Sequence, residues 1–304
     1  MNMSSKAENI CISICIATFK RPDKLERLLH SLVKALDKLD VSFDVVVVDN
    51  DVSRSAEGII KQIKILLPNV IYLNEPEQNI SLARNRAISK ARGKWLAFVD
   101  DDEIVDSDWL REYWHYQKIH SADGYFGPVL PSVEAETPAW LDAELIFSRP
   151  RFQTGTRLTD KMRTGNAFVR ASVFEKNKFD PGYGLRGGGD AIFFTLRAKE
   201  NFKFLWNDAA ITYEIYPRER TKLTWLMQRY FRSGLNFSTF RLQQNYSRFG
   251  IFLKAFTVLL LLTITLVFRF LLSPKKGVLH FLRMCLQVGH IAACFNFPYY
   301  EYKQ

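Results

Sequence analysis

The residues most suited to chemistry are the acidic side chains of residues 98–103, Phe-Val-Asp-Asp-Asp-Glu, which follow an apolar run. In an extended segment Asp100 and Asp102 point to the same side, because successive side chains alternate between faces. Two such carboxylates suit a hard cation, Mg²⁺ or Mn²⁺, whose other positions a substrate diphosphate completes. The alternative is a solvated loop leading into the next helix. We favour the metal and diphosphate interpretation.

A second acidic cluster, Asp49-Asn50-Asp51, follows the apolar run of residues 43–48. Taken alone, it could equally be a turn or a helix cap. Both clusters come directly after predicted strands, and open α/β sheets bind their ligands at the carboxyl ends of parallel strands. Two clusters on one rim therefore indicate a binding site.

The elements that must position these clusters alternate along the chain. Short apolar runs predict strands, and leucines at three- and four-residue spacing predict helices. Such alternation predicts an α/β fold whose mostly parallel central sheet has helices on both faces. The predicted strands are residues 10–17, 43–48, 70–73, 95–99, 124–129, 166–170, 202–206 and 211–215, and the predicted helices are 22–39, 55–66, 81–91, 106–120 and 190–201. A glycine-rich loop, residues 180–190, opens the last of these helices and is expected to be mobile.

Several protein classes are excluded by missing patterns. Residues 17–22, after the first strand, contain no glycine, so the chain has neither a dinucleotide-binding nor a P-loop motif there. Its four cysteines show no CxxC spacing, which argues against a zinc site and a disulfide framework. Residues 1–9 lack the apolar core of a signal peptide, so we expect a protein of the reducing cytoplasm.

The net charge of +10 is concentrated at one end of the chain. Residues 218–304 carry a net charge of +11, whereas residues 1–217 carry −1. The same end holds the apolar segments 251–272 and 278–297. Basic residues that flank apolar helices favour an anionic membrane surface over a nucleic acid, with a solvated basic face as the alternative. Two interfacial or re-entrant helices and a hairpin that spans the bilayer both remain open.

The order of motifs along residues 10–235 resembles glycosyltransferase family 2, and within it the bacterial exopolysaccharide and O-antigen glucosyltransferases of the succinoglycan-biosynthesis type. The order of the motifs is more specific than any single one. The matching segments are residues 14–22, 47–50, 82–86, 91–93, 100–102, 164–166, 179–180, 188–190 and 218–234.

This resemblance implies a nucleotide-diphospho-sugar transferase fold of the GT-A type over residues 10–235. A polar tail, residues 1–9, would precede it, and a basic, apolar membrane-associating segment, residues 236–304, would follow. The implied enzyme is a metal-dependent, inverting hexosyltransferase. It would move a hexose from a nucleotide-sugar donor to a lipid-linked saccharide acceptor in surface polysaccharide assembly, at the cytoplasmic face of the bacterial inner membrane.

The resemblance also implies roles for individual residues. Asp190 matches the general base, and Asp102 the residue that binds Mg²⁺ or Mn²⁺. Donor-binding positions, in order along the chain, are Thr18, Arg21, Asp49, Asp51, Arg84, Asp100, Asp101 and Arg220. Among them Thr18 and Arg21 would line the nucleotide pocket, Asp49 would hold the base and Asp100 would approach the ribose. For the acceptor we nominate Trp140, whose ring could stack on a sugar, and Asn166.

Alternative interpretations stay open for two of these regions. Asp190 could act as a helix N-cap only. Gly189 stands where many relatives carry a glutamate. A non-catalytic, membrane-bound nucleotide-sugar-binding scaffold is therefore the alternative function. Arg229 and Arg232 could contact a diphosphate or form a basic helix face turned to the membrane.

Overall fold

The computed structural model describes residues 10–134, 137–185 and 187–297, so the predicted polar tail 1–9 lies outside the described residues. The chain forms two compact units. The sheet unit comprises Met1–Leu130, Arg149–Leu185 and Gly189–Glu214, and the helical unit comprises Pro131–Ser148, Arg186–Gly188 and Ile215–Gln304. The domain boundary that we predict at residues 235 and 236 falls inside a helix of the helical unit and stays a prediction.

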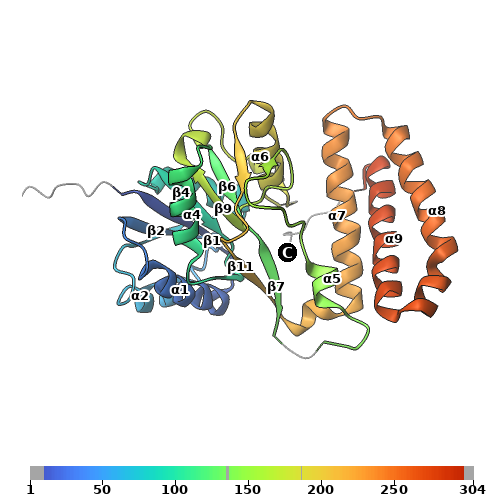
Figure 1. The fold of residues 1–304 in the computed structure, drawn as a ribbon, viewed down its shortest axis with the longest axis horizontal. Helices are drawn as coiled ribbons and strands as arrows, with labels where there is room; N and C mark the ends of the chain where they lie inside the picture. The colour runs from blue at the N-terminus through green and yellow to red at the C-terminus, as the bar shows by residue number, and fades with distance from the viewer. Residues whose placement is uncertain (1–9, 135–136, 186, 298–304) are drawn as a thin grey trace, which may run out of the picture. The chain divides into compact units, whose positions relative to one another are not determined.

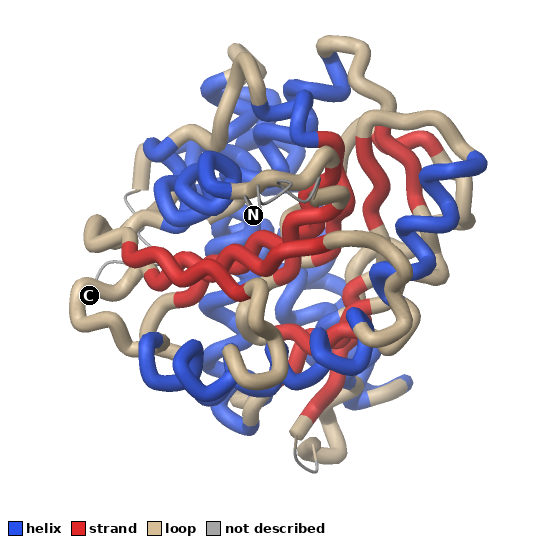
Figure 2. Tube along the Cα trace, turned by 90° about the vertical axis from the view of Figure 1, so that its left-hand side faces the viewer, coloured by secondary structure: helices blue, strands red, loops and turns tan. Residues whose placement is uncertain are grey.

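The sheet unit is built on an eight-stranded sheet of order β3-β2-β1-β4-β9-β6-β10-β8 (Figures 1 and 2). Its strands are β1 (Ile12–Thr18), β2 (Phe43–Asp49), β3 (Val70–Asn74), β4 (Trp95–Val99), β6 (Gly124–Phe126), β8 (Arg157–Leu158), β9 (Asn166–Arg170) and β10 (Phe204–Trp206). Strands β3, β2, β1 and β4 are parallel, whereas β9 runs antiparallel to both of its neighbours, β4 and β6. The predicted α/β fold with a mostly parallel sheet is confirmed.

Helices cover both faces of this sheet because its strands are apolar on both sides. Side chains such as Ile14 and Val47 point to one face and pack under α1, α2 and α4, whereas Cys15 and Val46 point to the other, under α3 and α6. The helices are α1 (Pro22–Leu36), α2 (Glu57–Ile63), α3 (Ile80–Lys90), α4 (Trp109–Ile119) and α6 (Gly189–Lys199), with the 3₁₀ turns η1 (Ala171–Phe174) and η2 (Pro181–Tyr183). This packing fixes the positions of the strand ends.

One predicted strand, residues 124–129, divides into two. Strand β6 belongs to the large sheet, and β7 (Val129–Val133) belongs to a three-stranded sheet of order β5-β11-β7 with β5 (Glu103–Val105) and β11 (Thr212–Tyr216). The break falls at Gly127, where a Cβ would lie 2.3 Å from the Ala210 carbonyl oxygen and 2.7 Å from the Tyr113 hydroxyl. Only glycine fits this close approach, and the chain turns there.

The helical unit contains α5 (Ala143–Phe147), η3 (Arg218–Thr221), α7 (Leu223–Gln243), α8 (Arg248–Leu272) and α9 (Pro274–Cys294) (Figure 1). Helix α9 packs against both α7 and α8. Glycines allow close contact, because a Cβ at Gly234 of α7 would lie 2.1 Å from the Leu286 carbonyl oxygen of α9. By length and composition, α8 and α9 are both long and apolar enough to cross a membrane.

Candidate active site

Four segments of the sheet unit converge at one rim of the large sheet. Strands β1 and β4 end there at Thr18 and Val99, and the acidic residues 100–103 follow directly. Strand β9 runs antiparallel to β4 and pairs its first residue, Asn166, with Val99. The start of β9 therefore brings Thr164 to the same rim as the ends of the parallel strands. Thr164 reaches the site because β9 runs antiparallel to β4, and the order of the strands alone does not predict this direction.

The carboxylates at this rim form ion pairs with two arginines. Arg84 from α3 lies 3.0 Å from Asp100, and Arg21 lies 3.2 Å from Asp101 and 3.3 Å from Asp102. Opposite charges at these distances hold the side chains in place. The same two arginines are suited to a diphosphate, because guanidinium groups bind phosphate oxygens in a fork-like geometry. The structure thus brings together five of the predicted site residues, and a sixth, Thr18, donates a 2.8 Å hydrogen bond to Asp101.

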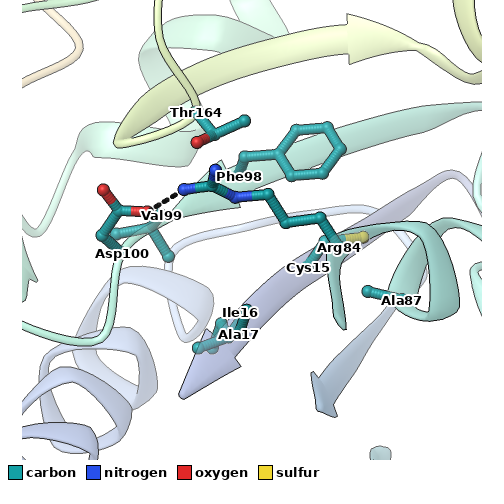
Figure 3. Close-up of a pocket in the computed structure, with 9 residues that line it drawn as sticks. All are labelled: Cys15, Ile16, Ala17, Arg84, Ala87, Phe98, Val99, Asp100 and Thr164. Atoms are coloured by element: carbon teal, nitrogen blue, oxygen red, sulfur yellow. Dashed lines mark hydrogen bonds and ion pairs between the residues drawn. The ribbon is translucent and has the colours of Figure 1, made fainter. Parts of the chain in front are cut away.

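Figure 3 shows a pocket beside this network, in which Arg84 reaches toward Asp100 below Thr164. Its lining residues are Cys15, Ile16, Ala17, Arg84, Ala87, Phe98, Val99, Asp100 and Thr164. The charged groups lie at one end and the apolar ends of β1 and β4 line the rest. Arg84 therefore contributes to the pocket and to the ion-pair network.

The predicted general base, Asp190, lies in the first turn of α6. Its Oδ2 accepts hydrogen bonds from the Thr164 amide at 3.0 Å and from the Thr164 hydroxyl at 3.1 Å. Burial raises the pKa of Asp190, but Arg84, Arg163 and the Thr164 amide outweigh it, so this pKa lies below that of an ordinary carboxyl. Asp190 is consequently a fixed, ionised carboxylate whose charge is coupled to Arg84, the partner of Asp100.

Glu103, the last of the acidic residues that follow β4, lies among charged residues from other parts of the chain, of which Arg149 was not predicted from the sequence. Glu103 is 1% exposed, and neither of its carboxylate oxygens has a hydrogen-bond partner within the described residues. It approaches Gly165, where a Cβ would lie 2.6 Å from Glu103 Oε1 and 3.4 Å from Arg149 Nη1. Arg149 in turn forms an ion pair with Glu214. No local pattern marks Arg149, because its partners are distant in sequence.

We expect Glu103→Gln to stabilise the protein without divalent metal, increasingly as pH rises. Burial, then the charge of Asp100, raises the pKa of Glu103 well above its ordinary value. A raised pKa contributes stability below the unfolded pKa, near 4.5, and that contribution is lost at higher pH. The free energy of unfolding of the variant should therefore be close to that of the wild type at pH 4.5 and higher than that of the wild type at pH 8.

Urea unfolding with a chelator present measures this effect, and the exposed Glu77→Gln serves as the control. A difference in unfolding free energy that is the same at both pH values would show that Glu103 does not titrate as described. Glu77→Gln should show no growing difference.

The second acidic cluster is organised around internal hydrogen bonds. Asp49 is fully buried and accepts hydrogen bonds from the Asp51 and Ala56 amides and, at 3.0 Å, from the Tyr72 hydroxyl. Asp51 accepts hydrogen bonds from Ser53, which help to hold the pKa of Asp51 below its ordinary value, although burial acts in the opposite direction. Both carboxylates lie at the end of β2. Their contact with a nucleotide stays a prediction.

The remaining nominated residues lie in three different settings. Asn166 is 2% exposed, donates to the Pro128 and Ala210 carbonyls, and accepts from Trp109 and Tyr113. These contacts use the full bonding capacity of its amide, so nothing in its geometry supports acceptor binding. Trp140 packs against the hydrophobic cluster of the helical unit. Arg220 lies in η3 of the same unit.

The chemistry of the rim residues fits a divalent cation whose other ligands come from substrate. Within the described ranges, no three His, Cys, Asp or Glu side chains are grouped so that they could hold a metal. Mg²⁺ in nucleotide sites, however, commonly takes one or two carboxylates and completes its shell with phosphate oxygens and water. Asp102, with Asp100, supplies such carboxylates beside arginines suited to the diphosphate.

Comparison with known proteins identifies the class of this fold and site. Residues 13–177 match glycosyl transferase family 2, and the chain belongs to that family. It is therefore a transferase enzyme that acts on sugars. The family that the sequence motifs predict is confirmed.

Individual relatives agree with this assignment. The chain is 31% identical to the succinoglycan biosynthesis protein ExoM of Rhizobium meliloti (strain 1021), over 75% of this chain and 74% of ExoM. It is 26% identical to a poly(ribitol-phosphate) beta-glucosyltransferase of Bacillus spizizenii (strain ATCC 23059 / NRRL B-14472 / W23), over 60% of this chain and 28% of that protein.

A solved structure shows the same fold. S. aureus TarS 1–349 in complex with UDP-GlcNAc aligns with a TM-score of 0.56 at 20% identity, over 68% of this chain and 59% of TarS. At this identity the likeness concerns the fold, and it confirms the predicted glycosyltransferase architecture.

Proposed function

We propose that this protein is an inverting glycosyltransferase that moves a hexose from a nucleotide-diphospho-sugar to a saccharide acceptor. The observation that carries the proposal is the coupling of two sets of carboxylates through Arg84. Arg84 pairs with Asp100 of the rim at 3.0 Å and also lowers the pKa of Asp190. A donor held at the rim would thus have a fixed, ionised carboxylate nearby.

The reaction follows from the residues on each side of the donor sugar. The acceptor hydroxyl oxygen forms a bond to the anomeric carbon while the bond from that carbon to the diphosphate oxygen breaks, and the nucleoside diphosphate leaves. Asp190 accepts the hydroxyl proton as the bond forms, as a general base does. Attack opposite the leaving group in a single displacement inverts the anomeric centre.

Arg21 and Arg84 are assigned to the donor diphosphate, whose negative charge grows as the bond breaks. They are already held by Asp100, Asp101 and Asp102, so little reorganisation is needed. A bound Mg²⁺ or Mn²⁺, held by Asp102 with Asp100, would supply further positive charge to the leaving group. An anionic diphosphate on Arg84 also weakens the hold of Arg84 on the Asp190 charge, which raises the basicity of Asp190.

Transfer from a labelled donor tests the proposal directly. The full chain is incubated with a radiolabelled UDP-, GDP- or dTDP-hexose, Mn²⁺ and a lipid extract of the host membrane. We expect label in the lipid fraction and one nucleoside diphosphate released per sugar transferred. Donor binding without transfer to any extract would instead indicate the non-catalytic scaffold.

The setting of the reaction is inferred from the relatives and the apolar helices. ExoM is named for succinoglycan biosynthesis, and TarS has been solved with UDP-GlcNAc. A uridine nucleotide is therefore the first donor to test. We assign the acceptor to a lipid-linked saccharide of surface polysaccharide assembly, at the cytoplasmic face of the membrane.

Helix α8 supports the membrane assignment, since only 6% of its most apolar stretch is buried within the protein. Its exposed side chains include Phe256, Leu260, Leu261, Ile264, Val267, Phe268 and Leu271. A contiguous, exposed and mostly apolar surface marks an interaction site, and on a long apolar helix it suits lipid. Arg269, Lys275 and Lys276 at the turn into α9 suit anionic headgroups.

Charged substitutions on α8 should therefore release the protein from membranes. We expect Ile264→Asp combined with Phe268→Asp to lower the vesicle-bound fraction at least about tenfold, because each buries a carboxylate in lipid. Flotation with phosphatidylcholine vesicles containing one-fifth phosphatidylglycerol measures this fraction. Ile65→Asp, at an 83% exposed site of the sheet unit, is the matched control. Equal flotation of both variants would contradict the membrane assignment.

A further inference from the structure

Three aromatic rings of the helical unit surround the guanidinium of Arg229. The Arg229 Cζ lies 5.5 Å from the ring centroid of Phe147, 5.3 Å from that of Tyr216 and 5.4 Å from that of Trp225. These rings come from α5, β11 and α7, so separate segments of chain build the group. We call Arg229 with these three rings the arginine box. Cation–π contacts at such distances fix the position of a guanidinium.

Aromatic rings and one hydroxyl group hold the guanidinium of Arg229. Within the described residues Arg229 makes no ion pair with Asp or Glu, and its guanidinium donates a 3.2 Å hydrogen bond to the Tyr216 hydroxyl. A guanidinium has five N–H donors, and several are left for a ligand. Because its plane is held by aromatic rings, Arg229 is pre-organised for two parallel hydrogen bonds to phosphate oxygens.

A second arginine lies beside the arginine box, and the packing of α7, α8 and α9 shows at which end of the bundle the box lies. Arg220 lies over the same indole, 5.6 Å from the Trp225 ring. Leu226 of α7 and Val278 of α9 share one hydrophobic cluster, and His280 of α9 contacts Thr265 of α8 at 2.9 Å. The start of α7, the start of α9 and the end of α8 therefore lie at one end of the three-helix bundle.

A phosphorylated lipid has a charged phosphate and an apolar chain, and the helical unit offers binding groups for both. The turn between α8 and α9 at this end carries Arg269, Lys275 and Lys276, and α8 offers an exposed apolar surface along its length. A phosphate in the arginine box would be attached to a chain that lies on apolar helices. A soluble anion would gain nothing from that surface.

We propose that the arginine box binds the phosphate or diphosphate group of the lipid-linked acceptor. This inference rests on the proposed function and adds to it the group by which the acceptor is recognised. Arg229 contacts the phosphate oxygens, and Phe147, Tyr216 and Trp225 hold its guanidinium. Arg220 supplies a second positive charge to the acceptor phosphate, in place of the donor binding that the resemblance implies for it. Recognition of the acceptor then lies in the helical unit, whereas the carboxylates assigned to the donor lie in the sheet unit.

Binding of farnesyl diphosphate to the full chain in detergent, with a chelator present, tests this proposal. Farnesol provides the same chain without phosphate. We expect the diphosphate to bind at least about tenfold more tightly than farnesol, and Arg229→Ala to remove this advantage. Arg229→Lys should retain part of it, because lysine keeps the charge but not the fork. The affinity of Arg229→Ala for UDP with Mn²⁺ should equal that of the wild type.

Arg241→Ala is the matched control, because Arg241 also stacks on two rings of the helical unit, 5.2 Å from Phe237 and 4.6 Å from Tyr246. It should bind farnesyl diphosphate within twofold of the wild type. Equal losses in Arg229→Ala and Arg241→Ala would overturn the proposal. If Arg229→Ala does not fold, unchanged affinity in Arg229→Lys would overturn it.

Two further results would show that the arginine box binds a different anion from the acceptor phosphate, and either would refute the proposal. Loss of UDP affinity in Arg229→Ala would assign the arginine box to the donor. A loss confined to vesicles containing phosphatidylglycerol, with farnesyl diphosphate binding intact, would assign it to membrane headgroups. Failure of the proposed function is distinguishable, because a wild type that binds farnesyl diphosphate but no nucleotide sugar would refute only the donor site.

Discussion

Replacing Asp190 with asparagine should lower the rate of sugar transfer by at least about 100-fold while leaving donor affinity within a few-fold. The carboxamide keeps the shape of the side chain and can still accept a hydrogen bond from Thr164, but it cannot take a proton from the acceptor hydroxyl. Single-turnover transfer measures the chemical step, and calorimetry measures donor affinity. The predicted result is a loss in rate without a loss in binding.

The matched control is Asp180→Asn, in the loop that precedes α6. Asp180 accepts a 2.8 Å hydrogen bond from the Gly182 amide and serves as a local cap. It should retain most of the transfer activity. If Asp190→Asn kept more than a tenth of the wild-type rate, Asp190 would be a helix-cap residue and another group would be the base. Because the pKa of Asp190 lies below the ordinary value, its titration should not limit activity above pH 5.

Replacing Asp102 with asparagine should abolish the metal-dependent part of nucleotide binding. Asp102 is the carboxylate assigned to the cation. Mutation of residues that only support a metal ligand already weakens metal affinity by about 10- to 100-fold, so loss of the ligand itself should cost at least as much. Electron paramagnetic resonance of Mn²⁺ in the presence of a nucleoside diphosphate counts the bound ion. Transfer should fall at least about 100-fold in parallel.

The change in nucleotide affinity of Asp102→Asn without metal distinguishes loss of a metal ligand from a general loss of structure. Asp102 lies 3.3 Å from Arg21 and 3.6 Å from Lys24, so its replacement by asparagine removes one negative charge beside those cations and reduces repulsion of the anionic nucleotide. Without metal, the variant should therefore bind a nucleoside diphosphate at least as tightly as the wild type. Asp108→Asn, at a carboxylate paired with Lys38 and Arg111, is the control. Unchanged Mn²⁺ affinity in Asp102→Asn would exclude Asp102 as a ligand.

Most of the sheet unit was predictable because its signals are local. Continuous apolar runs of strand length and the leucine spacing of α1 specify buried elements in sequence order. Asp100, Asp101 and Asp102 follow the last of four parallel strands, so the rim to which they belong follows from topology alone. The structure places Thr18, Arg21 and Arg84 against them. That these three residues bind a donor, as the resemblance implies, stays a prediction.

Residues joined over long sequence separations were not predictable in this way. Thr164 reaches Asp190 because β9 pairs antiparallel with β4, and the sequence of β9 does not encode its direction. Arg149 forms an ion pair with Glu214, which lies 65 residues further along the chain. Asn166 matches a family motif, but its buried amide is fully bonded to neighbours in the core. The position of a residue in a family motif predicts that the residue has a role, but only its contacts in the structure show what that role is.

The most direct test of the account is calorimetric titration of the wild-type protein with UDP-, GDP- and dTDP-sugars, with and without Mn²⁺. No acceptor has to be known for this measurement. We expect that one of the nucleotides binds and that its binding requires the metal, since the rim carboxylates would otherwise repel the diphosphate. Absence of binding across the panel by folded protein would contradict the donor site.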